Sequence, residues 1–407
     1  MRVFDSRALL RGWVLWRAAP LFALAALGGC GFEDPPLRPV TQPPPAPQPL
    51  PPPPPPAALC WTKTGEMQEY RGSPGALLLA DGRVLVVGGV GGSEGQSVTS
   101  AELYDPATGA WTLTAPMRER RADPAVVQLE DGRVLVAGGW TRPSTWAGGS
   151  SFHATAELYD PATNTWSSAA PMRHERSSPT GLRLPDGRVL VSFGILYGPD
   201  NALELYDPAQ NAWTELPDPP WVGVRAGRPA LLPDGRPFFA SALLSAAYDA
   251  ASGAWQEAAS KQGGGLQRLW AFPDGRVLSP RSFSDGAGEL YAPAADRWTR
   301  TGGYLEPRET EELALLHDGR LLLAGGVRPR EWLPLASSEH FDPDTGAWAP
   351  AGRMAQPRYD HVLVTLKDGR VLAAGGVAGP EWVRTAELFD PACPGPRQGG
   401  LPAPQGE

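Results

Sequence analysis

Residues suited to metal and redox chemistry are scarce in this 407-residue chain, which has five histidines and three cysteines. The histidines show no metal-ligand spacing, so no metal site and no cofactor are expected. They are His153, His174, His317, His340 and His361. The chain also lacks a basic run, and its net charge is −8. This acidic balance argues against a nucleic-acid partner and against electrostatic docking on anionic lipid.

The N-terminal apolar stretch AAPLFALAALGG is too short to span a bilayer as a helix. Because four arginines precede it, residues 1–29 are interpreted as a secretory signal peptide. The sequence LGGC that ends at Cys30 resembles the bacterial lipobox, whose cysteine is diacylated, for instance with palmitate, and becomes the mature N-terminus. Lipid on Cys30 would anchor the chain to a membrane of the cell envelope. Gly31, where Asp often retains lipoproteins at the inner membrane, favours the outer membrane, with the domain facing the periplasm or the surface. The alternative is an ordinary signal peptide with an incidental cysteine.

Proline dominates the segment that follows. Residues 30–57 combine Cys30 with the run PPLRPVTQPPPAPQPLPPPPPP at 35–56, which predicts a stiff polyproline II stalk with a reach of roughly 70 Å. A Pro-rich ligand for a partner domain is the other interpretation. At the opposite end, residues 395–407 are expected to form a disordered tail.

The tripeptide Asp-Gly-Arg occurs seven times between short apolar runs, as in AVVQLEDGRVLVAGG. It begins at Asp81, Asp131, Asp186, Asp234, Asp274, Asp318 and Asp368. Asp-Gly in this setting predicts a tight hairpin with a type I′ turn, in which both central residues need a positive φ. A period near 50 residues is typical of stacked repeat units.

A second landmark follows the first six hairpins, as in ELYDPATGAW (102–111) and EHFDPDTGAW (339–348). It predicts an aromatic-bearing strand that turns into a strand opening with Trp, which gives four strands per unit and no helical period. The units resemble the Kelch repeat, whose signature is Gly-Gly, then an aromatic residue with Asp-Pro, then Trp. The resemblance implies an all-β fold, a seven-bladed β-propeller of four-stranded blades over residues 58–394. Gly-Gly is missing at 193–194, 241–242 and 281–282, so the fourth and fifth blades are expected to be distorted or to carry wider connections.

The seventh unit has no Trp after its ELFDPA sequence (387–392). Instead, CWTKTGEM at 60–67 aligns with AWTLTAPM at 110–117, so the N-terminal segment is expected to supply the outermost strand of the last blade. Cys393 and Cys60 then lie two positions apart across one turn, mostly within disulfide range at about 5 to 7 Å between Cα atoms. We expect a Cys60–Cys393 disulfide in the oxidising compartment that the leader implies.

Side chains that recur in most units are expected to hold the blades together rather than to bind a ligand. They are the tryptophans at 61, 111, 166, 213, 255, 298 and 348, the glutamates at 102, 157, 204, 289, 339 and 387, and the arginines at 71, 121, 176 and 358. Buried charges of both signs at fixed positions are expected to pair.

Five further tryptophans fall in connections that a four-stranded meander brings to one face, and arginines accompany them. These candidate binding residues are Trp140, Trp146, Trp221, Trp332, Trp382, Arg328, Arg330 and Arg384. Exposed aromatic rings beside charges suit sugar rings or a protein partner. The alternative is that these loop tryptophans only seal adjacent blades.

The leading hypothesis is therefore a lipid-anchored, extracytoplasmic binding module for a glycan or a protein, with no catalytic residues assigned. The alternative is a carbohydrate-active enzyme of an epimerase or hydrolase kind. Its acid/base groups would be Glu306, Glu309, Glu311 and Glu312 with Arg308, although such a run also suits a solvated loop. Copper radical oxidases share the propeller but need a Tyr–Cys crosslink, and both propeller cysteines are assigned to the disulfide.

Overall fold

The computed structural model describes residues 60–91, 95–142, 150–192, 194, 203–220, 228–263, 268–280, 287–309 and 312–393. The chain divides into the units Met1–Pro53 and Pro54–Glu407, and every described residue belongs to the second. The predicted signal peptide, Cys30, the stalk and the tail lie outside the described residues. In the part of the chain that the structure describes, no helix has the length and apolar character needed to cross a membrane.

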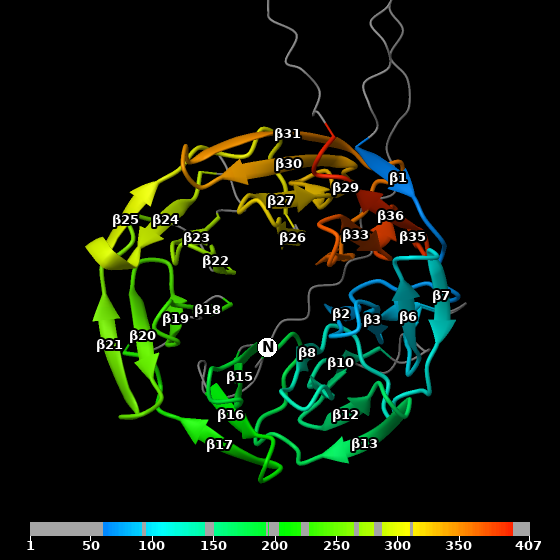
Figure 1. Cartoon of the computed structure of the whole chain (residues 1–407), viewed down its shortest axis with the longest axis horizontal. Helices are drawn as coiled ribbons and strands as arrows, with labels where there is room; N and C mark the ends of the chain where they lie inside the picture. Colours follow the sequence, from blue (N-terminus) through cyan, green and yellow to red (C-terminus); the bar gives the residue numbers. More distant parts are fainter. Residues whose placement is uncertain are drawn as a thin grey trace, which may run out of the picture. The chain divides into compact units, whose positions relative to one another are not determined.

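Seven four-stranded antiparallel sheets form the domain, and Figure 1 shows them arranged as blades around a central channel. The predicted seven-bladed β-propeller is confirmed. From the channel outward, the first three blades are β2 (Gly75–Leu78), β3 (Val84–Val87), β6 (Ala101–Asp105) and β7 (Ala110–Leu113); β8 (Ala125–Gln128), β9 (Val134–Ala137), β12 (Ala156–Asp160) and β13 (Thr165–Ala169); and β14 (Thr180–Arg183), β15 (Val189–Ser192), β16 (Leu203–Asp207) and β17 (Ala212–Leu216).

The next three blades are β18 (Ala230–Leu231), β19 (Pro237–Ala240), β20 (Ser245–Asp249) and β21 (Ala254–Ala258); β22 (Trp270–Ala271), β23 (Val277–Ser279), β24 (Glu289–Ala292) and β25 (Arg297–Arg300); and β26 (Glu312–Leu315), β27 (Leu321–Ala324), β30 (Ser337–Asp342) and β31 (Ala347–Arg353). The seventh is β32 (Val362–Thr365), β33 (Val371–Ala374), β36 (Ala386–Phe389) and β1 (Trp61–Lys63). One 3-10 turn, η1 (Pro293–Ala295), lies between β24 and β25.

Four two-stranded sheets extend the connections between the second and third strands of the first, second, sixth and seventh blades. They are β4 (Val90–Gly91) with β5 (Gln96–Ser97), β10 (Trp140–Thr141) with β11 (Ser151–Phe152), β28 (Val327–Arg328) with β29 (Leu333–Pro334), and β34 (Val377–Ala378) with β35 (Glu381–Trp382). The inner strands β18 and β22 have two residues each. Among the described residues, the fourth and fifth blades, which lack Gly-Gly, therefore have shorter inner strands than the other five blades.

Each Asp-Gly-Arg sequence forms a hairpin, but the predicted type I′ turn is wrong. In the first copy only Gly82 has a positive φ, and the Leu79 N–H donates to the Arg83 carbonyl at 2.8 Å, which leaves three residues in the loop. The Asp81 carboxylate accepts the backbone N–H of Arg83 at 2.9 Å. This bond holds the aspartate outside the left-handed region, so the glycine alone supplies the positive φ.

The recurring tryptophans lie between blades. Trp111 stands opposite Tyr104 on the neighbouring strand, with 4.9 Å between the ring centroids, and its indole N–H donates to the Gly65 carbonyl at 2.8 Å. Gly65 belongs to the segment that arrives from the seventh blade. Equivalent indole bonds to the preceding segment are made by Trp166, Trp213, Trp255 and Trp298. These tryptophans therefore serve as packing.

A buried ion pair also recurs in five blades. The Arg71 guanidinium donates to Glu102 at 3.1 Å and to the carbonyls of Gly88 and Ser100 at 2.8 and 2.9 Å. The equivalent pairs are Arg121–Glu157, Arg176–Glu204, Arg308–Glu339 and Arg358–Glu387. These arginines are fully buried, and they fix the backbone that leads into the inner strands.

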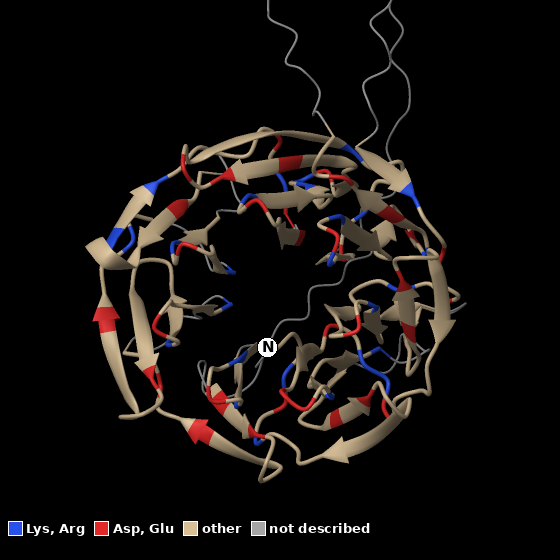
Figure 2. Cartoon of the chain, viewed as in Figure 1, with Lys and Arg blue, Asp and Glu red and all other residues tan. Residues whose placement is uncertain are grey.

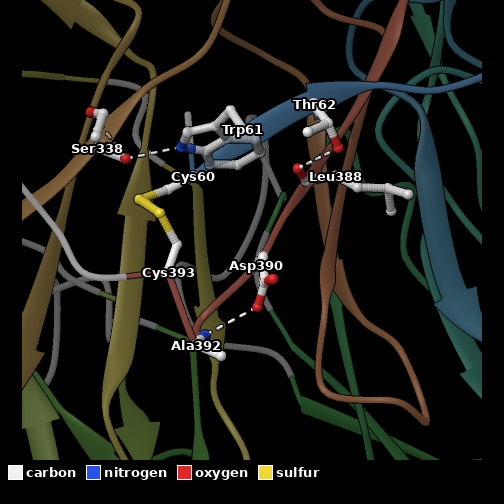
Figure 3. Close-up of a disulfide and its surroundings, with 9 residues drawn as sticks. Cys60, Trp61, Thr62, Ser338, Leu388, Asp390, Ala392 and Cys393 are labelled. Carbon is white, nitrogen blue, oxygen red and sulfur yellow. Dashed lines mark hydrogen bonds between the residues drawn. A yellow bond between two sulfur atoms is a disulfide. The ribbon is translucent and has the colours of Figure 1, made fainter. Parts of the chain in front are cut away.

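The N-terminal segment closes the ring as predicted. In the seventh blade, β1 pairs with β36 in a register that places Trp61 opposite Phe389. The Cys60–Cys393 disulfide is present, with 5.3 Å between Cα atoms (Figure 3). The Trp61 indole N–H donates to Ser338 of the sixth blade at 2.9 Å. The closing strand is thus fastened to both its own blade and the neighbouring one.

Candidate binding site at the channel mouth

The inner strands enclose a cavity of about 520 Å³ in the central channel. A volume of this size is within the range of small-ligand sites. Its wall comes from strands such as β2, β8, β26 and β32, and most of the accessible surface of this wall is polar. The charged residues that line the cavity are Asp123, Arg228, Arg268 and Glu312.

One position in each blade forms a ring at one mouth of the channel, two residues before the inner strand. In the described residues, this mouth ring consists of Ser73, Asp123, Ser178, Arg228, Arg268 and Asp360. Adjacent members are linked through the backbone, because the Asp123 N–H donates to the Ser73 carbonyl at 2.7 Å and the Ser73 N–H to the Asp360 carbonyl at 2.8 Å. These three residues have φ near +50°, a conformation that non-glycine residues rarely adopt.

Two carboxylates stand on either side of Ser73. The Ser73 hydroxyl donates to Asp360 at 3.3 Å, and Ser178 donates to Asp123. Burial raises the pKa of Asp123, against the lowering influence of Arg268. Burial and the negative charge of Asp123 raise the pKa of Asp360. The two acids are therefore close enough to repel each other.

Two arginines occupy the ring positions of the fourth and fifth blades. Arg268 donates to Glu312 at 3.2 Å, and the Arg228 guanidinium lies 5.6 Å from the ring centroid of Trp270. Burial, and then Arg268, lower the pKa of Arg228 to about 10. Because this side chain is open to the channel, we expect water to offset part of the lowering, and it stays protonated at neutral pH in either case. Figure 2 shows basic residues at the inner ends of the blades that contain β18 and β22.

The connections between second and third strands lie beside this mouth. Backbone bridges join Gly72 to Val90, and Ala122 to Trp140, directly before ring residues Ser73 and Asp123. The face predicted from the sequence and the channel mouth are therefore the same face. Trp140 is half-buried there in β10, whereas Trp146 and Trp221 lie outside the described residues.

The remaining predicted residues of this face have different surroundings. Trp332 is 62 % exposed and is the clearest candidate for contact with a partner. Trp382 instead packs between blades: a Cβ added at Gly95 would come within 2.3 Å of its ring. The alternative that loop tryptophans seal adjacent blades therefore describes Trp382 best.

The predicted arginines are also distributed around the face. Arg328 pairs with Glu306 at 2.8 Å and with Glu331 at 3.2 Å. Arg384 pairs with Glu66 at 3.1 Å, and Arg330 has φ +70° in the exposed turn before Trp332. The six predicted residues that the structure describes thus have separate surroundings on this face.

The acidic run proposed for catalysis is dispersed. Glu306 accepts the Ser337 hydroxyl at 2.6 Å, and Glu312 lines the channel, while Glu311 lies outside the described residues. Arg308 is a buried member of the recurring ion pairs. Its assignment to a loop site is wrong. Four other blades have a Met four residues before the buried arginine, whereas the sixth blade has Tyr304 there. For this reason the sequence did not identify Arg308 as the equivalent arginine.

The sequence interpretation missed Asp123, Arg228, Arg268 and Asp360 and set Trp270 aside. A signal exists in alignment of the repeats, since the ring position is Ser in two blades but Asp or Arg in four others. Among the described residues, no group of three His, Cys, Asp or Glu side chains could hold a metal ion. The chemistry that the mouth offers is ion pairing, hydrogen bonding and stacking.

Comparisons with known proteins agree with this architecture. A model of the Kelch motif matches residues 71–118 and 120–173, which are the first two repeats. No curated relative matches the chain in sequence. Among solved structures, a fungal alcohol oxidase of the AA5 family in complex with copper is similar, with a TM-score of 0.64 and 16% identity over 81% of this chain and 76% of that one. At this identity the likeness shows the fold alone. The Kelch motif in the two matched repeats and the seven four-stranded blades make the chain a Kelch-repeat β-propeller.

Proposed function

We propose that the chain is a lipid-anchored, extracytoplasmic binding module that takes a glycan or protein ligand on the face where the channel opens. The observation that carries the proposal is the channel mouth, where two arginines, two carboxylates and an indole line one cavity, namely Arg228, Arg268, Asp123, Glu312 and Trp270. Concave sites in which a few polar groups converge are typical of ligand binding. The exposed Trp332 on the same face offers stacking area beyond the cavity.

Placement outside the cytoplasm rests on separate observations. The disulfide suits an oxidising compartment, and the sequence LGGC with its Pro-rich stalk suits an anchor that holds the domain away from a membrane. We expect Cys30→Ser to abolish incorporation of labelled palmitate and to move the protein from the membrane fraction to the soluble fraction. Palmitate incorporation that persists in Cys30→Ser would contradict the anchor without affecting the binding proposal.

The binding proposal is tested with the domain on glycan arrays and in pull-downs from envelope extracts. Trp332→Ala and Arg228→Gln are each expected to reduce binding at least tenfold without lowering the melting temperature. The matched control is Leu113→Ala. Leu113 is 42% exposed and lies on β7, the outermost strand of the first blade, away from the channel. Binding that survives both mouth-face variants, or that Leu113→Ala removes equally, would show that the face is assigned wrongly.

A further inference from the structure

The charged groups of the mouth ring are separated by sign. Asp123 and Asp360 belong to the second and seventh blades, which flank the first, whereas Arg228 and Arg268 belong to the fourth and fifth. Opposite charges thus occupy different arcs of one ring. A ligand that reached across the mouth would meet carboxylates at one end and guanidinium groups at the other.

The acidic arc has few partners within the protein. Hydroxyl groups of Ser73 and Ser178 are the side-chain donors recorded for Asp360 and Asp123. Neither aspartate forms an ion pair with another described residue, although the charge of Arg268 acts on both, and both residues are partly buried. Two nearby carboxylates that face the same opening create a favourable position for an ammonium group, which neutralises their repulsion.

The basic arc has one cation that forms an ion pair and one that forms none with another described residue. Arg268 shares its charge with Glu312, while the contact recorded for Arg228 among the described residues is the face of Trp270. A guanidinium held on an indole face keeps its N–H groups pointing outward in a plane, which suits bidentate binding of a carboxylate.

We propose that the channel mouth binds a ligand carrying both an ammonium group and a carboxylate, with the ammonium at Asp123 and Asp360 and the carboxylate at Arg228. Short peptides with free ends, and amino-acid substituents on a larger chain, have this chemistry. The cavity of about 520 Å³ accommodates a group of that size. This inference rests on the proposed function, because it specifies which chemical group of the glycan or protein would enter the mouth.

The test uses oligoglycines, whose two charges are separated by a backbone of adjustable length. Binding of diglycine, triglycine, tetraglycine and pentaglycine to the full domain would be measured by calorimetry, beside the N-acetylated and C-amidated forms of each. We expect one length to bind best, and capping either end of it to weaken binding by about tenfold to hundredfold, as for loss of one charge-assisted hydrogen-bonded pair. No binding at any length, or equal affinity of free and capped forms, would overturn the proposal.

Variants assign each end of the ligand. In Arg228→Gln the amidated and free peptides should bind alike, while the penalty for N-acetylation remains. In the double variant Asp123→Asn/Asp360→Asn the reverse pattern is expected. Arg228→Lys keeps the charge and serves as the matched control, with affinity between the parent and Arg228→Gln. If a variant with an unchanged melting temperature loses affinity equally for the free, N-acetylated and C-amidated peptides, the assignment is refuted.

The experiments distinguish an error in the proposed ligand class from an error in the proposed function. If a glycan or protein binds through Trp332 and Arg228 but oligoglycines show no dependence on their end charges, the binding face stands and the ligand class is wrong. If oligoglycines show both dependences but no macromolecule is captured, the mouth is a small-molecule site and the proposed function is wrong.

Discussion

Single side chains at repeated positions decide the stability of this propeller, and Glu102 provides the sharpest test. Its carboxylate accepts bonds from the fully buried Arg71 and from the backbone N–H of Gln68 at 2.7 Å. Glu102→Gln removes the buried counter-charge of the guanidinium, which keeps only the exposed Glu69 carboxylate at 3.7 Å, and turns an amide N–H₂ toward donors. We expect a loss of about 3–5 kcal/mol in the free energy of unfolding, measured by urea denaturation.

The fifth blade contains a matched control for that substitution. Glu289 occupies the position of Glu102 and accepts the Gln262 N–H at 2.8 Å, but its second oxygen has no hydrogen-bond partner among the described residues. Because no buried guanidinium depends on it there, Glu289→Gln should cost less than about 1 kcal/mol or stabilise the fold. Equal losses in the two variants would show that the charge of Arg71 is not what makes Glu102 important.

Asp123 is expected to destabilise the fold at neutral pH. Burial raises its pKa in the folded state, although Arg268 lowers it. Because the pKa of Asp123 is higher in the folded state, the folded state binds the proton at a higher pH than the unfolded state does. Asp123 therefore destabilises the fold less and less as the pH falls from neutral toward its unfolded pKa of about 4. Asp123→Asn should therefore raise the melting temperature at pH 7 and leave it unchanged at pH 3. Lower stability of Asp123→Asn at pH 7 would mean that Asp123 has a structural role instead.

At the scale of elements, the sequence predicted what depends on short, repeated patterns. The seven hairpins, the four-stranded units and the displaced closing strand all follow from Asp-Gly-Arg and from the Trp-containing segments, because turns and strand order are local or recurrent properties. The turn type was predicted wrongly, since the bond from the Asp81 carboxylate to Arg83 favours a three-residue loop.

The channel mouth could not be predicted in the same way. Its residues differ between blades. The rule that recurring residues are scaffold and unique residues are site candidates can find them only when the register of each inner strand is known. Trp270 lies in β22, inside a predicted strand, and therefore escaped a search among loops. Arg228 and Trp270 belong to the neighbouring fourth and fifth blades, and only the packing of these two blades brings them together.

The strand β1 is held by the disulfide, which joins positions 333 residues apart. Cys60→Ser/Cys393→Ser is expected to lower the free energy of unfolding by about 2–5 kcal/mol, because the unfolded chain loses a constraint on a very long loop. Urea denaturation with and without dithiothreitol measures this. The reductant should destabilise the parent by the same amount and leave the double variant unchanged, and a parent insensitive to reduction would contradict the expected role of the bond.

At the scale of the whole molecule, the core is a set of hydrophobic clusters between neighbouring blades. Trp61 and Cys60 pack with Leu322 and Ala324 of the sixth blade, while Met67 packs with Val84 of the first blade and Leu372 of the seventh. When a ring built in this way is closed, every blade packs against a neighbour on both of its faces. The segment 60–67 therefore completes two of the junctions between blades.

Deleting residues 58–67 should consequently open the ring. The deletion removes a buried tryptophan, a buried methionine and the disulfide, each worth roughly 2–5 kcal/mol, and their sum is comparable to the entire stability of a typical domain at about 5–15 kcal/mol. We expect loss of the cooperative urea transition and rapid cleavage in limited proteolysis. The control deletion of residues 397–407 removes a terminus of similar length that was predicted from the sequence to be a disordered tail, and it should change stability by less than about 1 kcal/mol. A mild effect of the first deletion would mean that six complete blades and three strands of the seventh hold together without closure, and that the N-terminal strand is an accessory rather than the fastening of the ring.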